Sequence, residues 1–339
     1  MAARHAPGAT AAVVKADGYG LGAEPIARRL LTAGCRHFFV AHLGEAMALR
    51  AALPGAMLAV LNGLPRGDEA AFAAAGIAPV LGSLDEIDRW TTLARAQGQS
   101  LPALLHVDSG MSRLGLEAFE VAALRTDPGR LAGIDILYTM THLVSAEWPD
   151  DPLNPRQRRR FEAARAMLPP APTSLANSSG LFLGPDFASD LARPGAALMG
   201  VNPTPQQPHP LRPVARLQAQ VLQVRGVAAG DTVGYNAMWR AARPSRIAVL
   251  GVGYADGWPV ALSGRGHASF DGRAVPLVGR VSMDLTTYDI TDHPAIAAGS
   301  LLELIGPGHT LEQVAAEAGT IPYEILTSLG RRYRRVYVN

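Results

Sequence analysis

Short apolar runs alternate with amphipathic segments over the first two-thirds of the 339-residue chain. The apolar runs predict buried strands at residues 11–14, 37–41, 57–61, 78–81, 101–107, 133–138, 173–176 and 196–199. The intervening segments predict helices after residue 22, from about residue 45, and at 68–75, 84–98 and 157–167. Ser83, with Glu86 three residues on, is expected to be the N-cap of the helix that ends near Gly98. Strands that are apolar on both faces are typical of parallel sheets. Roughly eight such strands, alternating with helices, predict a (β/α)8 TIM barrel rather than an open sheet.

The sequence changes character after residues 203–213, a segment with five prolines that is typical of a linker or domain boundary. Beyond it, short strands separated by glycine and aspartate turns are predicted at 214–224, 247–252, 275–278, 286–290 and 301–305. We therefore expect an α/β barrel over residues 1–210 and a smaller all-β domain over residues 211–339.

Composition and charge narrow the classes of function. A formal net charge of +2, without a long run of one sign, argues against a dedicated nucleic-acid surface. The single cysteine, Cys35, excludes a disulfide within the chain. No stretch reaches the roughly 18 apolar residues of a membrane helix, so a soluble, cytoplasmic protein is expected.

Lys15 is the single lysine among 31 lysine and arginine residues. Arginine can replace lysine in most surface roles, but only a primary amine forms a Schiff base with an aldehyde. Lys15 also follows the apolar run 11–14, and α/β barrels place their chemistry at the C-terminal ends of the strands. These observations predict a reactive amine; the alternative is one lysine left over in an arginine-rich composition.

Other candidate residues follow predicted strands in the same way. Arg113 lies in a glycine-bounded loop after strand 101–107, where it could clamp a carboxylate or orient a phenol, or could be an ordinary surface arginine. His142 follows strand 133–138 and could be catalytic or structural. Residues 176–180, Ala-Asn-Ser-Ser-Gly, could bind an anion or simply cap a helix.

Three further observations complete the list of motifs. Arg193-Pro194-Gly195 is expected to precede the strand at 196–199, with Gly195 allowing close approach of a phosphate. Residues 251–257 carry glycines at almost a dinucleotide-binding spacing, but the third is one residue late and Trp258-Pro259 disfavours a helix there. We find no P-loop, no Gly-x-Ser-x-Gly and no credible metal-ligand spacing.

Together, the motifs resemble those of the alanine racemase family, which consists of barrel-type enzymes that use pyridoxal 5'-phosphate (PLP). Those that carry the resemblance occur in the family's order at residues 14–20, 108–115, 141–142, 177–178, 193–195, 253–257 and 280–284. The resemblance thus covers nearly the whole chain, and the ordered set is far more specific than any single motif.

The resemblance implies that PLP is the cofactor and that Lys15 binds it covalently. Arg193 would face the pyridine nitrogen, and His142 would couple Arg193 to Tyr254. The residues implied to contact the cofactor are Lys15, Tyr19, His142, Asn177, Ser178, Arg193, Gly195 and Tyr323.

It also implies a two-base racemisation of L- and D-alanine that supplies D-alanine for peptidoglycan. Lys15 and Tyr254 would be the catalytic bases, while Arg113 and Met283 would bind the substrate. Tyr254 and Met283 would come from the partner in a head-to-tail homodimer. Alternatives are a racemase that accepts other amino acids, such as serine, or a PLP-binding protein without racemase activity, which the β domain disfavours.

The chain departs from the family pattern at two places. Only fourteen residues precede Lys15, so the family's first strand and helix are expected to be missing. His106 stands where many members have a carbamylated lysine, and histidine cannot form a stable carbamate of that kind. We therefore expect Arg113 to be held by a carboxylate, by a bound chloride, or by His106 as a neutral acceptor.

Overall fold

Parallel strands dominate the N-terminal part of this computed structural model, which describes residues 2–5 and 7–338. The chain divides into two compact units. The first comprises the chain up to Gly18 together with residues 22–198 and 202–210. The second comprises residues 19–21, 199–201 and the chain from Leu211 onward.

The strands of the first unit close into a barrel. They are β1 (Ala9–Thr10), β2 (Ala12–Val13), β3 (His37–Val40), β4 (Met57–Val60), β5 (Ala78–Leu81), β6 (Leu101–His106), β7 (Ile134–Met140), β8 (Thr173–Ser174) and β9 (Leu191–Ala192). Strands β2 to β8 pair in parallel in chain order, and β1 pairs with β9. Backbone hydrogen bonds from Ala11 N to Ala192 O (2.8 Å) and from Arg193 N to Ala176 O (2.8 Å) close the ring. Since β1 and β2 are successive parts of one strand, the predicted (β/α)8 barrel is confirmed.

The predicted strand at 196–199 is wrong. This segment is a short 3-10 helix, η4 (Ala196–Met199), and the last barrel strand is β9, whose residues are fully buried. Pro194 has no N–H for the ladder, and the Gly195 N–H and Ala197 N–H turn to the Ser178 hydroxyl instead. Arg193-Pro194-Gly195 consequently follows a strand rather than preceding one, which places Arg193 at the C-terminal end of the barrel.

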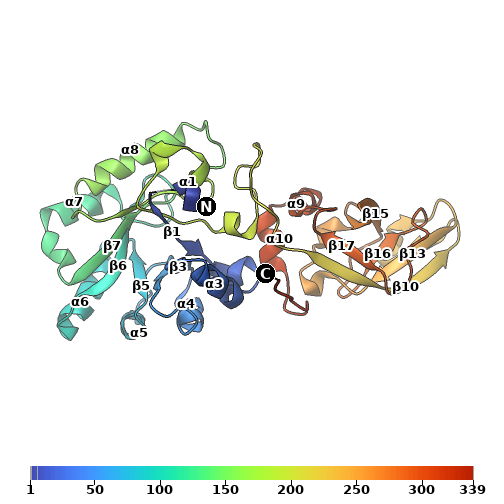
Figure 1. Ribbon diagram of the computed structural model, residues 1–339, viewed down its shortest axis with the longest axis horizontal. Helices are drawn as coiled ribbons and strands as arrows, with labels where there is room; N and C mark the ends of the chain where they lie inside the picture. The colour runs from blue at the N-terminus through green and yellow to red at the C-terminus, as the bar shows by residue number, and fades with distance from the viewer. Residues whose placement is uncertain (1, 6, 339) are drawn as a thin grey trace. The chain divides into compact units, whose positions relative to one another are not determined.

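Figure 1 shows the helices of the first unit outside the barrel strands. They are α1 (Ala2–His5), α2 (Lys15–Tyr19), α3 (Ala23–Thr32), α4 (Leu43–Arg50), α5 (Glu69–Ala74), α6 (Leu84–Gln97), α7 (Ala118–Thr126) and α8 (Leu153–Arg165), with short 3-10 turns η1 (Pro128–Leu131), η2 (Gly180–Phe182) and η3 (Pro185–Phe187). The predicted caps of α6 are confirmed. Ser83 Oγ accepts from Glu86 N, and Gly98 ends the helix with φ of 63°.

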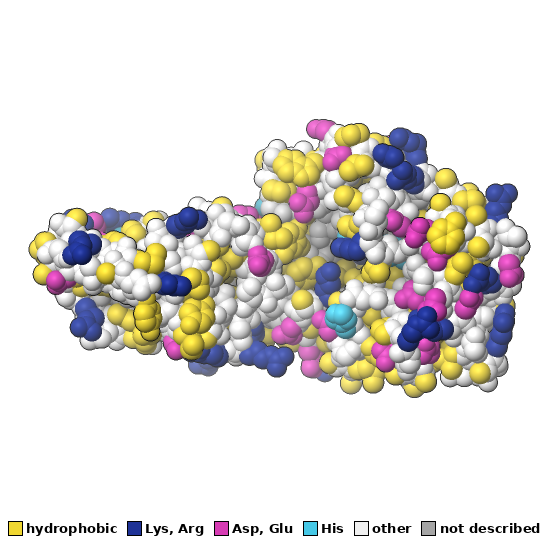
Figure 2. Space-filling view, turned by 180° about the vertical axis from the view of Figure 1, so that it is seen from behind, with side chains coloured by type: hydrophobic (Ala, Val, Ile, Leu, Met, Phe, Trp, Pro, Cys, Tyr) yellow, Lys and Arg dark blue, Asp and Glu magenta, His cyan; other side chains and the backbone are white. Residues whose placement is uncertain are grey.

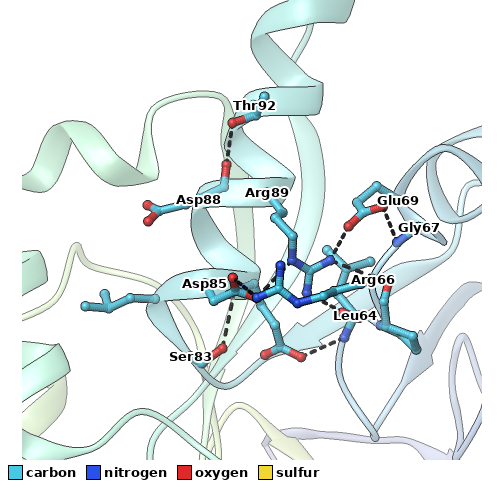
Figure 3. Close-up of polar contacts among 12 residues, drawn as sticks. Leu64, Arg66, Gly67, Glu69, Ser83, Asp85, Asp88, Arg89 and Thr92 are labelled. Carbon is cyan, nitrogen blue, oxygen red and sulfur yellow. Dashed lines mark hydrogen bonds and ion pairs between the residues drawn. The ribbon is translucent and has the colours of Figure 1, made fainter.

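Polar side chains fasten the start of α6 to the segment after β4 (Figure 3). Arg89 donates to Asp85 (3.0 Å), to Leu64 O (2.6 Å) and to Glu69. Glu86 accepts from Leu64 N (2.8 Å). The connections at the ends of neighbouring strands are thus fixed by contacts distant in the sequence.

The second unit contains a closed antiparallel barrel with strand order β10-β13-β16-β15-β14-β17. Its elements are β10 (Leu217–Val227), β11 (Thr232–Val233), η5 (Tyr235–Ala237), β12 (Trp239–Arg240), β13 (Ser245–Leu250), η6 (Tyr254–Asp256), η7 (Val260–Leu262), β14 (His267–Phe270), β15 (Arg273–Val278), β16 (Thr286–Asp289), β17 (Leu301–Ile305), α9 (Leu311–Ala318) and α10 (Pro322–Ser328). Trp258 and Tyr288 fill its core. The predicted β domain is confirmed. Strand β14 was not predicted, because His-Ala-Ser-Phe carries no long apolar run.

Two surface features bear on possible partners. Within the described residues, no helix has both the length and the apolar character needed to cross a membrane. Figure 2 shows positively and negatively charged side chains interspersed over the face that it presents.

Candidate functional site

Lys15 lies two residues beyond β2, at the C-terminal end of the barrel strands. Val14, just before it, is fully buried, and its N–H donates to Phe39 O on the neighbouring strand (2.9 Å). Burial lowers the pKa of the half-buried Lys15 amine, the positive charge of Arg113 lowers it further, and Glu45 opposes the change. A lowered pKa increases the fraction of neutral, nucleophilic amine near pH 7.

The chain makes a left-handed helical turn directly after Lys15. Residues 16–19 all have φ between 52° and 62°. For residues other than glycine, this conformation costs about 1–2 kcal/mol each. Hydrogen bonds compensate: Gly18 N donates to Val14 O (2.9 Å), and Asp17 Oδ1 accepts from Ala23 N (2.9 Å). The turn therefore holds the backbone beside Lys15 in a conformation that only its surroundings stabilise.

Glu45, on α4, is the side chain that anchors this turn from outside. One carboxylate oxygen accepts from Ala16 N (2.6 Å), and the other accepts from Ala41 N (2.8 Å) and His42 N (3.2 Å). Glu45 was not predicted as a site residue, because its contact with Ala16 spans 29 residues. The available signal was a glutamate in the first turn of a predicted helix.

The loop after β6 is folded around Asp108. Its carboxylate accepts from Gly110 N (2.8 Å), Met111 N (2.8 Å) and Ser112 N (3.0 Å). This arrangement presents Arg113 at an exposed position. The guanidinium is accordingly available to an anion, and its expected partner, whether a carboxylate, a chloride or His106, stays a prediction.

His106 is the last residue of β6 and is buried. Burial is the main cause that lowers its pKa to about 4; the charge of Arg193 acts in the same direction, and Asp108 opposes it. From the sequence alone, this histidine was expected to be either neutral or cationic near pH 7. In the structure it is neutral, so it can accept a hydrogen bond at one ring nitrogen.

His142, just beyond β7, lies where the fields of several cations converge. Its pKa is lowered to about 3, mainly by burial and further by the charges of Arg193, Arg113, His106 and Lys15. These are the basic residues that the sequence predicted for the barrel part of the site. A neutral histidine among cations indicates a site that suits an anionic ligand.

Gln157, on α8, fixes the backbone of this region and was not predicted. Its side chain is buried, and Nε2 donates to His142 O (3.0 Å) and to Ser109 Oγ (3.1 Å). Ser109 Oγ in turn lies 2.7 Å from Thr141 Oγ1. The loops after β6 and β7 are thereby joined, which positions His142 relative to the Arg113 loop.

Arg193 is a buried cation held by neutral oxygens. It donates to Thr141 O (2.6 Å) and to Ser174 Oγ. Burial lowers its pKa to about 10, so the guanidinium stays protonated at neutral pH. It can therefore donate hydrogen bonds to a ligand without giving up its proton.

Hydrogen bonds connect two of the predicted phosphate-binding residues. Ser178 Oγ accepts from Gly195 N (3.0 Å) and Ala197 N (3.2 Å). Asn177 Oδ1 accepts from Gly180 N (2.9 Å), as the capping interpretation predicts. The segment thus caps local backbone, and the Ser178 hydroxyl, which accepts from both N–H groups, keeps its own proton to donate to an anion.

Tyr254 and Met283 come together in the second unit. Tyr254 N donates to Ser282 O (3.0 Å), and Ala255 N donates to Met283 O (2.9 Å). A Cβ at Gly253 would lie 2.4 Å from Met283 O, so only glycine allows this approach. Both side chains project into solvent, Tyr254 with 46% and Met283 with 53% of its surface exposed.

The remaining predicted residues also belong to the second unit. Tyr323 lies on α10. Tyr19 ends the left-handed turn, and burial raises its pKa to about 12, so its phenol stays protonated and can donate.

The donor set in the barrel fits PLP chemically. An aldehyde requires a primary amine, which Lys15 supplies. A phosphate requires hydrogen-bond donors, and the Ser178 hydroxyl beside Gly195 offers one. A ring nitrogen requires a donor, and Arg193 provides one. The fold and the site together define a class of two-unit barrel proteins in which a lysine amine can react with an anionic ligand that carries an aldehyde.

Comparison with known proteins identifies the family within this class. Residues 1–203 match the family model described as alanine racemase, N-terminal domain, and residues 214–337 match alanine racemase, C-terminal domain. The alanine racemase of Acidiphilium cryptum is 58% identical over 99% of this chain and 94% of its own length. That of Brucella abortus is 50% identical over 100% and 89%. The chain belongs to the alanine racemase family.

Solved structures agree with this assignment. Alanine racemase from Bartonella henselae, whose structure contains covalently bound pyridoxal phosphate, superimposes with a TM-score of 0.96 at 45% identity, covering 99% of this chain and 94% of that one. The biosynthetic alanine racemase from Pseudomonas aeruginosa gives 0.89 at 33% identity, with the same coverage.

Proposed function

We propose that this protein interconverts L- and D-alanine with PLP as its cofactor, and so supplies D-alanine for peptidoglycan. The observation that carries the proposal is the place of the single lysine. Lys15 lies at the barrel rim with a lowered pKa, among cationic groups that suit an anionic cofactor and substrate. Membership of the alanine racemase family supports the same activity.

The residues that would hold PLP follow from the donor set. Lys15 would bind its aldehyde carbon, Ser178 and the Gly195 N–H would bind its phosphate with Tyr19, Asn177 and Tyr323, and Arg193 would donate to its ring nitrogen. When bound, PLP withdraws electrons from the substrate Cα and makes its proton more acidic.

The chain's own residues would supply the acid–base chemistry. Lys15 Nζ, once displaced by the substrate amine, can take a proton from Cα because its lowered pKa keeps part of it neutral. Racemisation needs a second base on the opposite face, and the exposed Tyr254 phenol is the proposed group. Arg113, exposed on its loop, would hold the substrate carboxylate.

We also propose that the active molecule is a head-to-tail homodimer, with the domain boundary near residues 210 and 211. Tyr254 and Met283 would reach the site of the partner subunit. Both residues are exposed in the single chain, and so is Leu285 nearby, with 41% of its surface exposed. An exposed apolar surface of this kind supports the proposal that a partner subunit covers it. Each site would then combine a barrel from one chain with a β domain from the other.

A racemase assay on the purified protein with PLP tests the proposal. Circular dichroism of L-alanine should decay to the racemic value, and D-alanine should give the mirror-image decay. Serine should be tested in parallel. No decay with either alanine enantiomer, in protein that has bound PLP, would overturn the proposed activity.

A further inference from the structure

Three ligand-type side chains gather in the second unit, outside the site described above. His267 is the first residue of β14, His309 lies between β17 and α9, and Glu317 is on α9. Their donor atoms all lie within 4.8 Å of one another. His309 is fully buried, while the side chains of His267 and Glu317 are 21% and 22% exposed. His267 is far in the sequence from His309 and Glu317, which is why linear spacing did not reveal the cluster.

The carboxylate of Glu317 faces both imidazole rings. His267 Nδ1 lies 2.6 Å from Oε1, and His309 Nε2 lies 3.2 Å from Oε2. The two rings are stacked, with centroids 3.7 Å apart and planes inclined by 33°. Two imidazole nitrogens and one carboxylate therefore converge on one small volume at the β14–α9 side of the barrel, with one ligand atom from each residue.

Hydrogen bonds leave part of this cluster unsatisfied. Among the described residues, the buried atoms His309 Nε2 and Glu317 Oε2 lie 3.2 Å apart and make no other hydrogen bond of standard geometry, while the Leu304 backbone also lies within reach of the His309 ring. Burying polar atoms in this state costs free energy. A cation that accepted their lone pairs would remove the cost.

The donor set matches a known class of metal site. Two imidazoles and one carboxylate, with an open position for water, are a common ligand set for Zn²⁺ and related ions. Ligand bonds of about 2.0–2.1 Å in a tetrahedron place donor atoms roughly 3.3 Å apart. The distance of 3.2 Å between His309 and Glu317 already agrees; that between His267 and Glu317 would have to lengthen by roughly 0.7 Å.

We propose that His267, His309 and Glu317 bind one divalent cation of the zinc class, with water as the fourth ligand. The ion joins β14, the segment after β17 and helix α9, so its effect is to stabilise the second unit. It takes no part in the amine chemistry of Lys15, and the proposal stands or fails independently of the racemase activity.

The test uses the untagged, PLP-loaded full chain, stripped of metal by dialysis against a chelator and then dialysed against Zn²⁺. We expect one zinc ion per wild-type chain. Glu317→Gln, which keeps the shape and removes the charge, should lower the zinc affinity at least roughly tenfold, since even outer-shell changes have effects of 10–100-fold. Glu312→Gln, on the same helix and exposed, is the matched control and should bind like wild type.

Two further readouts accompany the binding measurement. Zn²⁺ should raise the melting temperature of wild type and of Glu312→Gln, but not of Glu317→Gln. Co²⁺ should give the visible absorption of a tetrahedral site in wild type only. Should Glu317→Gln fail to fold, His267→Gln replaces a partly exposed ligand and provides the same comparison.

The proposal is overturned if wild type shows no saturable binding of Zn²⁺ or Co²⁺ at one ion per chain. It is also overturned if the ligand variants bind as tightly as Glu312→Gln, because the metal would then lie elsewhere. In either case the cluster is a hydrogen-bonded contact in which Glu317 bridges two stacked histidines.

Discussion

Glu45 is expected to act on the reactive amine of Lys15 in two ways. It holds the left-handed turn that follows Lys15, and its negative charge raises the pKa of the amine. Replacing Glu45 by glutamine keeps the size of the side chain but removes its charge. Two consequences follow from the contacts: the backbone N–H groups of Ala16, Ala41 and His42 lose a charged acceptor, and Lys15 loses a nearby negative charge.

The expected loss of stability follows from those three hydrogen bonds. Bonds to a charged group contribute about 1.5–3 kcal/mol and neutral ones about 0.5–1.5 kcal/mol. The amide of glutamine also turns a donor toward one N–H. Taking the lower ends, because the contacts lie near solvent, Glu45→Gln should reduce the free energy of unfolding by about 2–3 kcal/mol. Glu24→Gln, which breaks an exposed pair with Arg28, should cost less than about 0.5 kcal/mol.

The single lysine allows its pKa to be measured directly. With lysine labelled at the ε-carbon, the PLP-free protein gives one lysine NMR signal, whose titration reports Lys15 alone. Because Glu45 raises the pKa of Lys15, Glu45→Gln should lower it further, while Glu24→Gln should leave it unchanged. An unchanged or raised pKa in Glu45→Gln, with a stability loss no larger than that of the control, would refute the role assigned to Glu45.

Three other predictions concern the remaining site residues. The pKa of His106 is about 4 in the folded chain against 6.5 in the unfolded chain, so the unfolded state binds the proton first as pH falls. In urea unfolding, the free energy of unfolding should therefore fall by about 3 kcal/mol between pH 6.5 and 4, and this loss should be absent in His106→Asn. Activity should not require CO₂, since histidine forms no lysine-type carbamate. Tyr254→Phe should abolish racemisation but leave exchange of the Cα proton for deuterium in one enantiomer, which the family pattern suggests is D-alanine. NMR measures this exchange, and equal exchange into both enantiomers would contradict the division of work between two bases. In Gly253→Ala the new Cβ would meet Met283 O and Ser282 O, each 2.4 Å away; the variant should lose about 1–3 kcal/mol of stability and most of its kcat, and wild-type kinetics would contradict the packing described for this loop.

Local sequence patterns predicted the features that local physics decides. The caps Ser83 and Gly98 were predicted because their chemistry is confined to a few residues. Most barrel strands were predicted because their apolar runs are continuous. The strand predicted at residues 196–199 was wrong because an apolar run of this length fits a strand or a helical turn equally. Hydrogen bonds to Ser178, which is distant in the sequence, favour the helical turn.

Contacts between distant segments explain what the sequence could not show. Glu45 reaches Ala16 across 29 residues, and Gln157 reaches Ser109 across 48. Nothing in a linear pattern distinguishes such a glutamate or glutamine from a surface residue. The left-handed conformation of residues 16–19 was equally hidden, since two of the four are not residue types that favour it.

Borohydride reduction of the PLP-loaded protein, followed by peptide mass spectrometry, tests the assignment of Lys15 most directly. One pyridoxyl group per chain should be found on Lys15 Nζ, and Lys15→Arg should lose both this group and alanine racemisation. A pyridoxyl group fixed at another internal residue, or racemisation that survives in Lys15→Arg, would contradict the account of the site.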